Sequence, residues 1–308
     1  MNEKNACAST VTRRRFLGGA MAGVGCLACG GVKSLFAADG SGLRRVPLML
    51  DAKRMAIHDG PGIRTTFFVK GCPLHCVWCH NPESIKPERQ TARFQHLCQH
   101  CAKCTMDEAT CPTRALKFYG KPATIDELVA KALEDKPFYD RTGGGVTISG
   151  GEPLFFWEWA FEFLSACKAS GLHTCLDTSL YAPPAAIERL LPVTDMWLPD
   201  FKCDDDARHQ SCTGVSNKVI KTNLKRLVAA KARLEVRCLV VPGLTEDMPA
   251  RYAFLESIGI ARKDVVELEY HDYARSKYQA LGIPDTMPKI GATARWTRSR
   301  DAGAARSP

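Results

Sequence analysis

Three cysteines lie within eight residues of one another with the spacing C-x3-C-x2-C, namely Cys72, Cys76 and Cys79. Three thiolates on one short loop can bind three irons of a 4Fe-4S cluster and leave the fourth iron without a protein ligand. An open coordination position allows inner-sphere chemistry on a bound substrate, as it does in catalytic zinc sites. The spacing alone leaves open a zinc site made of these cysteines with His75 or His80.

Four further cysteines follow as Cys98-x2-Cys101-x2-Cys104-x6-Cys111. The run resembles that of a bacterial ferredoxin, although its last interval is longer than usual. In two-cluster ferredoxins the last cysteine serves the other cluster, but only one run is present here, so Cys111 has to close its own site. We expect a second 4Fe-4S cluster, with a four-cysteine zinc site as the alternative.

Five other cysteines have no such spacing, and we expect them to be small buried hydrophobic residues. They are Cys167, Cys175, Cys203, Cys212 and Cys238.

The formal net charge of the chain is +9, and it is concentrated at the two ends. Residues 1–47 contribute +5 and residues 289–308 contribute +4, so the central part is close to neutral. A nucleic-acid-binding chain is expected to concentrate its charge on the folded domain. The charge distribution therefore argues against a nucleic-acid partner.

The first forty residues are typical of a targeting segment. Residues 12–17, TRRRFL, fit a twin-arginine export pattern, and a Gly-rich run over 18–32 follows. That run is too short and too rich in glycine to span a membrane. We expect a twin-arginine-type leader over 1–40 and export to the periplasm. If translation instead starts near Met49, the protein stays in the cytoplasm.

Strand-like and helix-like segments alternate between residues 48 and 288, which indicates a parallel sheet or barrel of βα units. About six units are too few for an eight-fold barrel, so we predict an α/β fold, a partial (β/α)6 TIM-type barrel. A cysteine-rich segment over 80–118 interrupts this domain as a small inserted ferredoxin-like iron–sulfur module, and the tail over 289–308 is predicted to be disordered. The predicted strands are 65–69, 146–149, 173–177, 195–201, 234–241 and 264–270; the predicted helices are 125–133, 157–170, 184–191, 217–231 and 249–258.

Two polar motifs stand at predicted strand ends. Gly150, Gly151 and Glu152 follow one strand, and glycines there permit close approach of the backbone to a ligand, although an ordinary turn would use them too. Asp200 and Lys202 alternate along another strand and so share one face. They either pair as a salt bridge or reach a ligand.

The segments IHDGPGIRTT (57–66) and GCPLHCVWCHNPES (71–84) resemble the opening of the activating enzymes of glycyl radical enzymes. This group of the radical S-adenosylmethionine (SAM) superfamily contains pyruvate formate-lyase activating enzyme, and the resemblance extends from about residue 48 to 282. It implies reductive cleavage of SAM at the first cysteine cluster and abstraction of hydrogen from a backbone glycine of a partner glycyl radical enzyme. A flavodoxin- or ferredoxin-type reductant is implied as well. The alternatives are a radical SAM enzyme that acts on another peptide or small molecule, and a non-catalytic iron–sulfur electron-transfer protein.

The resemblance also implies roles for single residues around SAM. The loop with Glu152 would hold the methionyl amino group, Asp200 and Lys202 would meet the ribose and carboxylate, and Asp59 would contact the protein substrate. Two departures, Leu180 and Ala274 at family glycine positions, affect fine geometry only. The remaining implied ligands of SAM or of a monovalent cation are Asp177, Thr178, Arg237 and His271.

Overall fold

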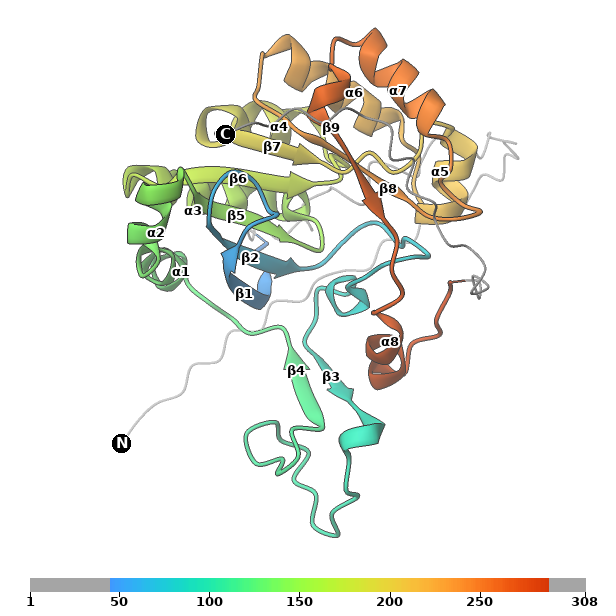
Figure 1. The fold of residues 1–308 in the computed structure, drawn as a ribbon. Coiled ribbons are helices and arrows are strands. Elements are labelled where there is room, and N and C mark those ends of the chain that lie inside the picture. Colours follow the sequence, from blue (N-terminus) through green and yellow to red (C-terminus); the bar gives the residue numbers. More distant parts are fainter. Residues whose placement is uncertain (1–44, 288–308) are drawn as a thin grey trace, which may run out of the picture. The chain divides into compact units, whose positions relative to one another are not determined.

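Apolar strands form the centre of the fold in the computed structural model, which describes residues 45–287 (Figure 1). Five strands form a mixed sheet in the order β1-β2-β5-β6-β7, in which only β1 runs antiparallel to its neighbour. The leader predicted over 1–40 and the tail predicted over 289–308 lie outside the described residues. The strands are β1 (Leu48–Ala56), β2 (Arg64–Lys70), β5 (Gly145–Gly150), β6 (His173–Thr178) and β7 (Met196–Pro199).

A second parallel pair continues from β7. It consists of β8 (Val236–Val240) and β9 (Val265–Glu269). Isolated parallel bridges join Trp197 to Leu234 and Asp200 to Arg237, so β8 follows β7 in space. The molecule therefore has an α/β fold with a mostly parallel, mixed sheet.

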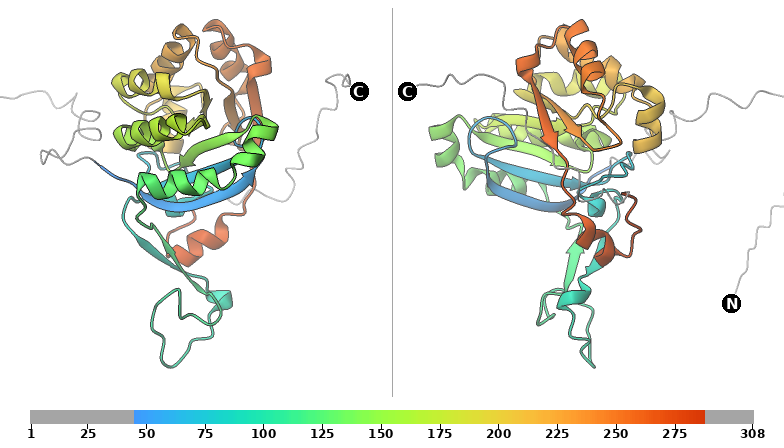
Figure 2. Two further views of the ribbon diagram at one scale, coloured as in Figure 1. Left: turned by 90° about the vertical axis from the view of Figure 1, so that its left-hand side faces the viewer. Right: turned by 45° about the vertical axis from the view of Figure 1, so that its right-hand side comes forward.

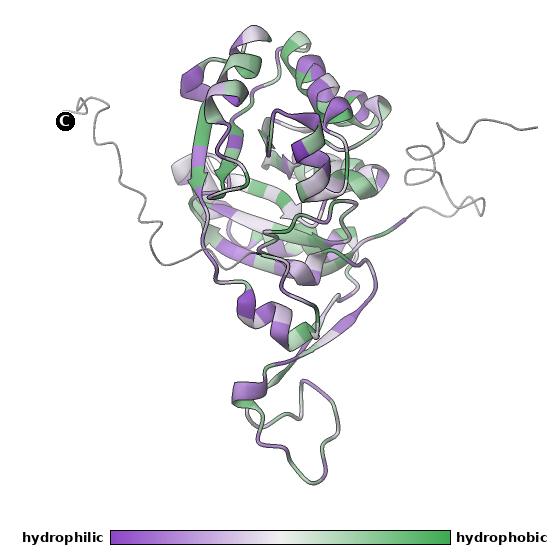
Figure 3. Cartoon of the chain, turned by 90° about the vertical axis from the view of Figure 1, so that its right-hand side faces the viewer, coloured by the Kyte–Doolittle hydropathy of each residue, from purple (hydrophilic) through white to green (hydrophobic). Residues whose placement is uncertain are grey.

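Helices connect successive strands, and α1, α3, α4 and α6 pack side by side along one face of the sheet (Figure 2). Hydrophilic and hydrophobic residues alternate along the helices of the fold (Figure 3). No helix among residues 45–287 is both long and apolar enough to span a membrane. The helices are α1 (Ile125–Leu133), α2 (Lys136–Thr142), α3 (Trp157–Ala169), α4 (Pro184–Leu190), α5 (Asp206–Thr213), α6 (Lys218–Ala229), α7 (Met248–Ser257) and α8 (Arg275–Leu281).

Helix α1 begins at a capping box, and its bounds are those predicted from the sequence. The Thr124 hydroxyl accepts from the Glu127 N–H at 3.2 Å, and the Glu127 carboxylate accepts from the Thr124 N–H at 2.7 Å. The two side chains thus satisfy two backbone donors at the first turn, which fixes where the helix starts.

The segment over 80–118 contains a hairpin that the sequence did not predict. Strands β3 (Gln90–Arg93) and β4 (Leu116–Tyr119) pair antiparallel, and residues 94–115 between them hold four cysteines. Within residues 94–115 the structure shows a single short 3-10 turn, Gln95–Leu97. The conformation of this segment is therefore set by few backbone hydrogen bonds.

Candidate active site

The first three cysteines and the polar strand ends meet at one cavity of about 240 Å³. The cavity lies where the carboxyl ends of β5, β6 and β7 face the loop that follows β2. Its lining includes Cys72, Cys76, Cys79, His80, Ser149, Gly150, Gly151, Glu152, Asp177, Thr178, Ser179, Asp200 and Lys202.

The cysteine loop is held by backbone hydrogen bonds on two sides. The Cys72 N–H donates to the Ile85 carbonyl at 3.0 Å, and the His75 N–H donates to the Thr213 carbonyl at the end of α5 at 2.8 Å. The first bond joins the start of the loop to the segment that follows it, and the second joins the loop to the end of α5. The thiols are therefore positioned by the fold itself.

Burial raises the pKa of the Cys72 and Cys76 thiols and raises the pKa of Cys79 to about 12. A buried thiol becomes a thiolate only when nearby positive charge compensates the burial, and bound iron supplies such charge. Three thiols on one cavity, with no fourth cysteine in its lining, fit a 4Fe-4S cluster that keeps one open iron. Among residues 45–287, no group of three or more His, Cys, Asp or Glu side chains is gathered closely enough to hold a single metal ion.

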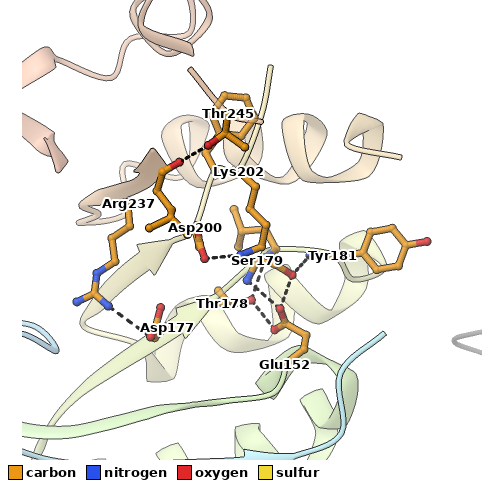
Figure 4. A network of polar contacts seen from close by, with 12 residues as sticks. Glu152, Asp177, Thr178, Ser179, Tyr181, Asp200, Lys202, Arg237 and Thr245 are labelled. Carbon is orange, nitrogen blue, oxygen red and sulfur yellow. Dashed lines mark hydrogen bonds and ion pairs between the residues drawn. The ribbon is translucent and has the colours of Figure 1, made fainter. Parts of the chain in front are cut away.

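Glu152 is buried beneath the cavity, and its carboxylate accepts four hydrogen bonds (Figure 4). One oxygen accepts from the Leu154 N–H at 2.9 Å and from the Thr178 hydroxyl at 2.6 Å. The other accepts from the N–H of Ser179 at 2.8 Å and from its hydroxyl. Burial raises the pKa of Glu152, and these bonds oppose the rise. The Glu152 carboxylate therefore joins its own loop to the end of β6, and all four of its hydrogen bonds are made within the protein. A ligand in the cavity would contact the backbone of this loop instead of the carboxylate.

The two glycines before Glu152 are required by the neighbouring strand. A Cβ on Gly150 would lie 2.4 Å from the Val69 N, and one on Gly151 would lie 2.3 Å from the Gly71 carbonyl oxygen. Gly150 also has a φ of +116°, which side-chain-bearing residues rarely adopt. The close approach that the structure shows is to β2 and the residue after it, whereas the sequence analysis expected close approach to a ligand.

Asp200 and Lys202 line the cavity as a pair, because the Lys202 ammonium donates to Asp200 Oδ2. Burial lowers the pKa of Lys202, but the Asp200 carboxylate and the nearby thiols raise it more, so it lies above its usual value. Asp200 Oδ1 is buried without a hydrogen-bond partner among the described residues. A buried, unsatisfied acceptor beside a cavity is suited to a donor on a bound ligand.

Arg237 lies next to the cavity without lining it (Figure 4). Its guanidinium pairs with Asp177 Oδ2 at 3.4 Å and donates to the His58 carbonyl at 2.6 Å. Asp177 Oδ2 also accepts from the Ser149 hydroxyl at 2.7 Å. Burial raises the pKa of Asp177, and Arg237 opposes that rise. The structure therefore places Arg237 behind Asp177, where it can hold that carboxylate, whereas the resemblance implied direct contact with SAM.

His271 does not line the cavity either. Its ring contacts the His80 ring edge to face, with centroids 4.5 Å apart, and stacks on Tyr273 at 4.6 Å. His80 itself lines the cavity, and burial, aided by His271 and Lys277, lowers its pKa to about 4. In the structure His271 thus reaches the cavity through His80.

Ser179 is a cavity residue that the sequence analysis did not single out. It follows Thr178 at the end of β6, and both of its hydrogen-bonding groups contact Glu152. The sequence pattern that could have identified Ser179 is the pair of polar residues, Thr178 and Ser179, at a strand end. The same kind of pattern identified Asp200 and Lys202.

The second cysteine run lines a separate cavity of about 90 Å³ between β3 and β4. Cys101 and Cys104 are exposed, whereas Cys98 and Cys111 are half-buried. The backbone around Leu116 lowers the pKa of Cys111 through hydrogen bonds. The four cysteines line one small cavity, but their side chains are not gathered closely enough to hold a single metal ion. The five isolated cysteines are buried, as predicted.

Residues 66–255 match the family model of the radical SAM superfamily. The chain is 35% identical over 278 residues to the (2S)-3-sulfopropanediol dehydratase activating enzyme of Klebsiella oxytoca, covering 79% of this chain and 88% of that one. It is 33% identical over 273 residues to the benzylsuccinate synthase activating enzyme of Thauera aromatica, covering 77% and 82%. The pyruvate formate-lyase 2-activating enzyme of Escherichia coli (strain K12) is 34% identical over 250 residues, covering 80% and 85%.

Membership of this superfamily implies a 4Fe-4S cluster and SAM as cofactors. The matched region of the family model does not include the twin-arginine-type leader, and nothing in these comparisons supports that signal. The residues that match the family model include the whole lining of the cavity and its three cysteines. The chain therefore belongs to the radical SAM superfamily and, within it, to the activating enzymes of glycyl radical enzymes.

Proposed function

We propose that Cys72, Cys76 and Cys79 hold the 4Fe-4S cluster and that SAM binds beside it in the 240 Å³ cavity. The observation that supports this assignment is that three thiols and the polar ends of three parallel strands line the same cavity. When bound, the cluster and SAM supply the one-electron chemistry that ends in abstraction of a hydrogen atom from a glycine Cα. The frame is a partial (β/α)6 barrel over 48–288, in which sites lie at the carboxyl ends of the strands.

The residues of this chain bind SAM and orient it. Asp200 Oδ1 would accept a hydrogen bond from a ribose hydroxyl, and Lys202 holds the Asp200 carboxylate in place through Oδ2. The backbone of Gly150 and Gly151 faces the methionyl amino group, and Glu152 holds that loop in place. Asp177 and Thr178 complete the SAM and monovalent-cation sites, with Arg237 fixing Asp177 and His271 acting through His80.

The protein substrate is a glycyl radical enzyme of the pyruvate formate-lyase type. The relatives are named for dehydratase, synthase and lyase partners, so activation of a partner enzyme is what their names share. A flavodoxin- or ferredoxin-type protein supplies the electron.

The segment over 80–118 acts as a ferredoxin-like module with a second 4Fe-4S cluster. Its ligands are Cys98, Cys101, Cys104 and Cys111, which line one cavity of their own. The half-buried pair, Cys98 and Cys111, lies near the hairpin strands and the exposed pair at the loop tip.

The first experiment is anaerobic SAM cleavage by the reconstituted, reduced full chain. We expect 5′-deoxyadenosine from the wild type, a fall of more than about 100-fold in Cys76→Ala, and a wild-type rate in Cys167→Ala, whose thiol lies buried in α3. Exposure to air should abolish the activity. A fully loaded, reduced protein that cleaves no SAM would instead indicate an iron–sulfur electron-transfer protein.

A further inference from the structure

Helix α8 contacts the chain immediately after the third cysteine. The Lys277 ammonium donates to the His80 carbonyl at 3.2 Å, to Asn81 Oδ1 at 2.9 Å and to Glu83 Oε1 at 2.7 Å. All three oxygens belong to residues 80–83, which leave the cluster loop. One side chain from near the end of the described chain thus holds a segment nearly two hundred residues earlier.

The next residue of α8 contacts the third cysteine itself. The Tyr278 hydroxyl donates to the Cys79 carbonyl at 3.0 Å, and the tyrosine side chain is buried. Farther along, the Thr286 hydroxyl donates to the Val77 carbonyl at 2.9 Å. The segment from α8 to residue 287 therefore grips the loop on both sides of Cys79.

The ion pair between Glu83 and Lys277 is partly buried, so its loss should destabilise the segment that carries Glu83. The Glu83 side chain is buried, and Lys277 is its only ion-pair partner among the described residues. The second carboxylate oxygen of Glu83, Oε2, is buried and has no hydrogen-bond partner among residues 45–287. Removing one member of a buried ion pair leaves an uncompensated charge, which disturbs the segment that carries it.

The other side of α8 packs on the cysteine-rich hairpin. Ala280 forms a hydrophobic cluster with Ala92 of β3 and Tyr119 of β4, and Leu281 packs against that cluster. The helix thereby lies between the loop of the first cysteines and the strands that support the second run. It is anchored independently of the loop that it grips.

We infer that Lys277 and Tyr278 are positioning residues that fix the Cys79 segment in the place from which its thiolate binds the cluster. This inference rests on the proposed role of Cys79 as a cluster ligand. Neither side chain lines the cavity, so both act through the backbone of residues 79–83.

The test compares Lys277→Met, Lys277→Arg and Tyr278→Phe with Gln279→Met, a change at an exposed position of the same helix. Each full-length protein is reconstituted with iron and sulfide, and iron loss to a chelator and the EPR spectrum with and without SAM are recorded. We expect Lys277→Met to lose iron from the SAM-responsive cluster about tenfold faster and to show an altered spectrum, because charge-assisted hydrogen bonds are lost. Lys277→Arg should restore most of the wild-type behaviour, and Gln279→Met should match the wild type.

Tyr278→Phe keeps the ring packing and removes only the hydrogen bond to the Cys79 carbonyl, so it tests the idea even if Lys277→Met does not fold. We expect iron loss about threefold faster in this variant. Wild-type iron loss and spectra in both variants would overturn the inference. A wild-type protein with no SAM-responsive EPR signal would instead overturn the proposed cluster site, so the two failures are distinguishable.

Discussion

The two cysteine runs are built in opposite ways. Cys72, Cys76 and Cys79 lie on a loop held by backbone hydrogen bonds, and all three residues are half-buried. The second run occupies residues 94–115, where two of its four cysteines are exposed. The comparison indicates that the fold itself positions the first three cysteines, whereas the proposed metal would have to bring the second four together.

The largest expected effect comes from Arg251, which donates to the backbone of Leu239, a residue in the lining of the first cavity. Its fully buried guanidinium donates to the Leu239 carbonyl at 3.1 Å and to the Thr245 carbonyl, and it pairs with Asp247 at 3.0 Å. Arg251→Met should lower the free energy of unfolding by about 3 to 5 kcal/mol, because it leaves buried carbonyls and a carboxylate unpaired.

Arg93→Met, beside the second run, is the matched control for Arg251→Met. Its side chain is half-buried and donates to the Met106 sulfur, so we expect a change below about 0.5 kcal/mol in urea unfolding. Equal losses in the two variants would remove the contrast between the regions.

Metal removal should expose the second run selectively. Trp78 in the first loop is 5% exposed, and Leu97 in the second segment is 42% exposed. After chelation, chymotrypsin should cut after Leu97 at least about 100-fold faster than after Trp78, since loosely held segments open at low free energy. Mass spectrometry of early fragments decides; first cleavage at Trp78 would reverse the comparison.

Asp135 joins the two strands, β1 and β2, that precede the first cysteine loop. A variant at this position tests how firmly these strands hold the loop in comparison with the second cysteine run. Its carboxylate accepts from Arg54 of β1 and from the Thr65 hydroxyl of β2, and the bond from Arg54 lowers the pKa of Asp135. A carboxyl whose pKa is lower in the folded state stabilises the fold above its unfolded pKa and loses that effect as pH falls through the folded pKa.

We therefore expect Asp135→Asn to cost about 2 kcal/mol near neutral pH, with the difference from wild type shrinking below about pH 4. Urea unfolding at several pH values measures it. A difference that stayed constant down to acidic pH would mean that the charge of Asp135 is not what stabilises the strands.

The smallest effect is expected where the chain returns from the hairpin to the main domain. Thr124→Ala removes the cap of α1 and should cost about 1 kcal/mol, as loss of an N-cap usually does. Thr124→Ser, which keeps the hydroxyl, should recover most of the loss in thermal unfolding. Equal melting temperatures for the alanine variant and the wild type would show that the Thr124 cap does not stabilise the start of α1.

Local patterns predicted the elements that depend on local interactions. The helix over Ile125–Leu133 was placed correctly because its cap, Thr124, acts within four residues. The hairpin of β3 and β4 and helix α8 were missed, since elements of four to seven residues depend on distant partners. Lys277, for example, contacts a residue 197 positions earlier.

The candidate site was predictable where strand geometry determines direction. Alternation along the predicted strand 195–201 put Asp200 and Lys202 on one face. The observed β7 ends at Pro199, and the two residues meet just beyond it as an ion pair. The cysteine spacing identified the loop that faces them. The directions of Arg237 and His271 were not predictable, because each side chain is turned toward a partner from another part of the chain. Those partners, Asp177 and His80, are visible only in three dimensions.

The carbonyl of Gly71 accepts a hydrogen bond from the Glu152 N–H at 2.9 Å, and the amide of the same glycine donates to the Ser84 carbonyl at 2.7 Å. Gly71, the residue before Cys72, therefore joins three segments mechanically: the start of the cysteine loop, the segment that leaves the loop, and the turn that contains Gly150 and Gly151. A displacement of any one of the three segments is transmitted to the other two through the main chain alone.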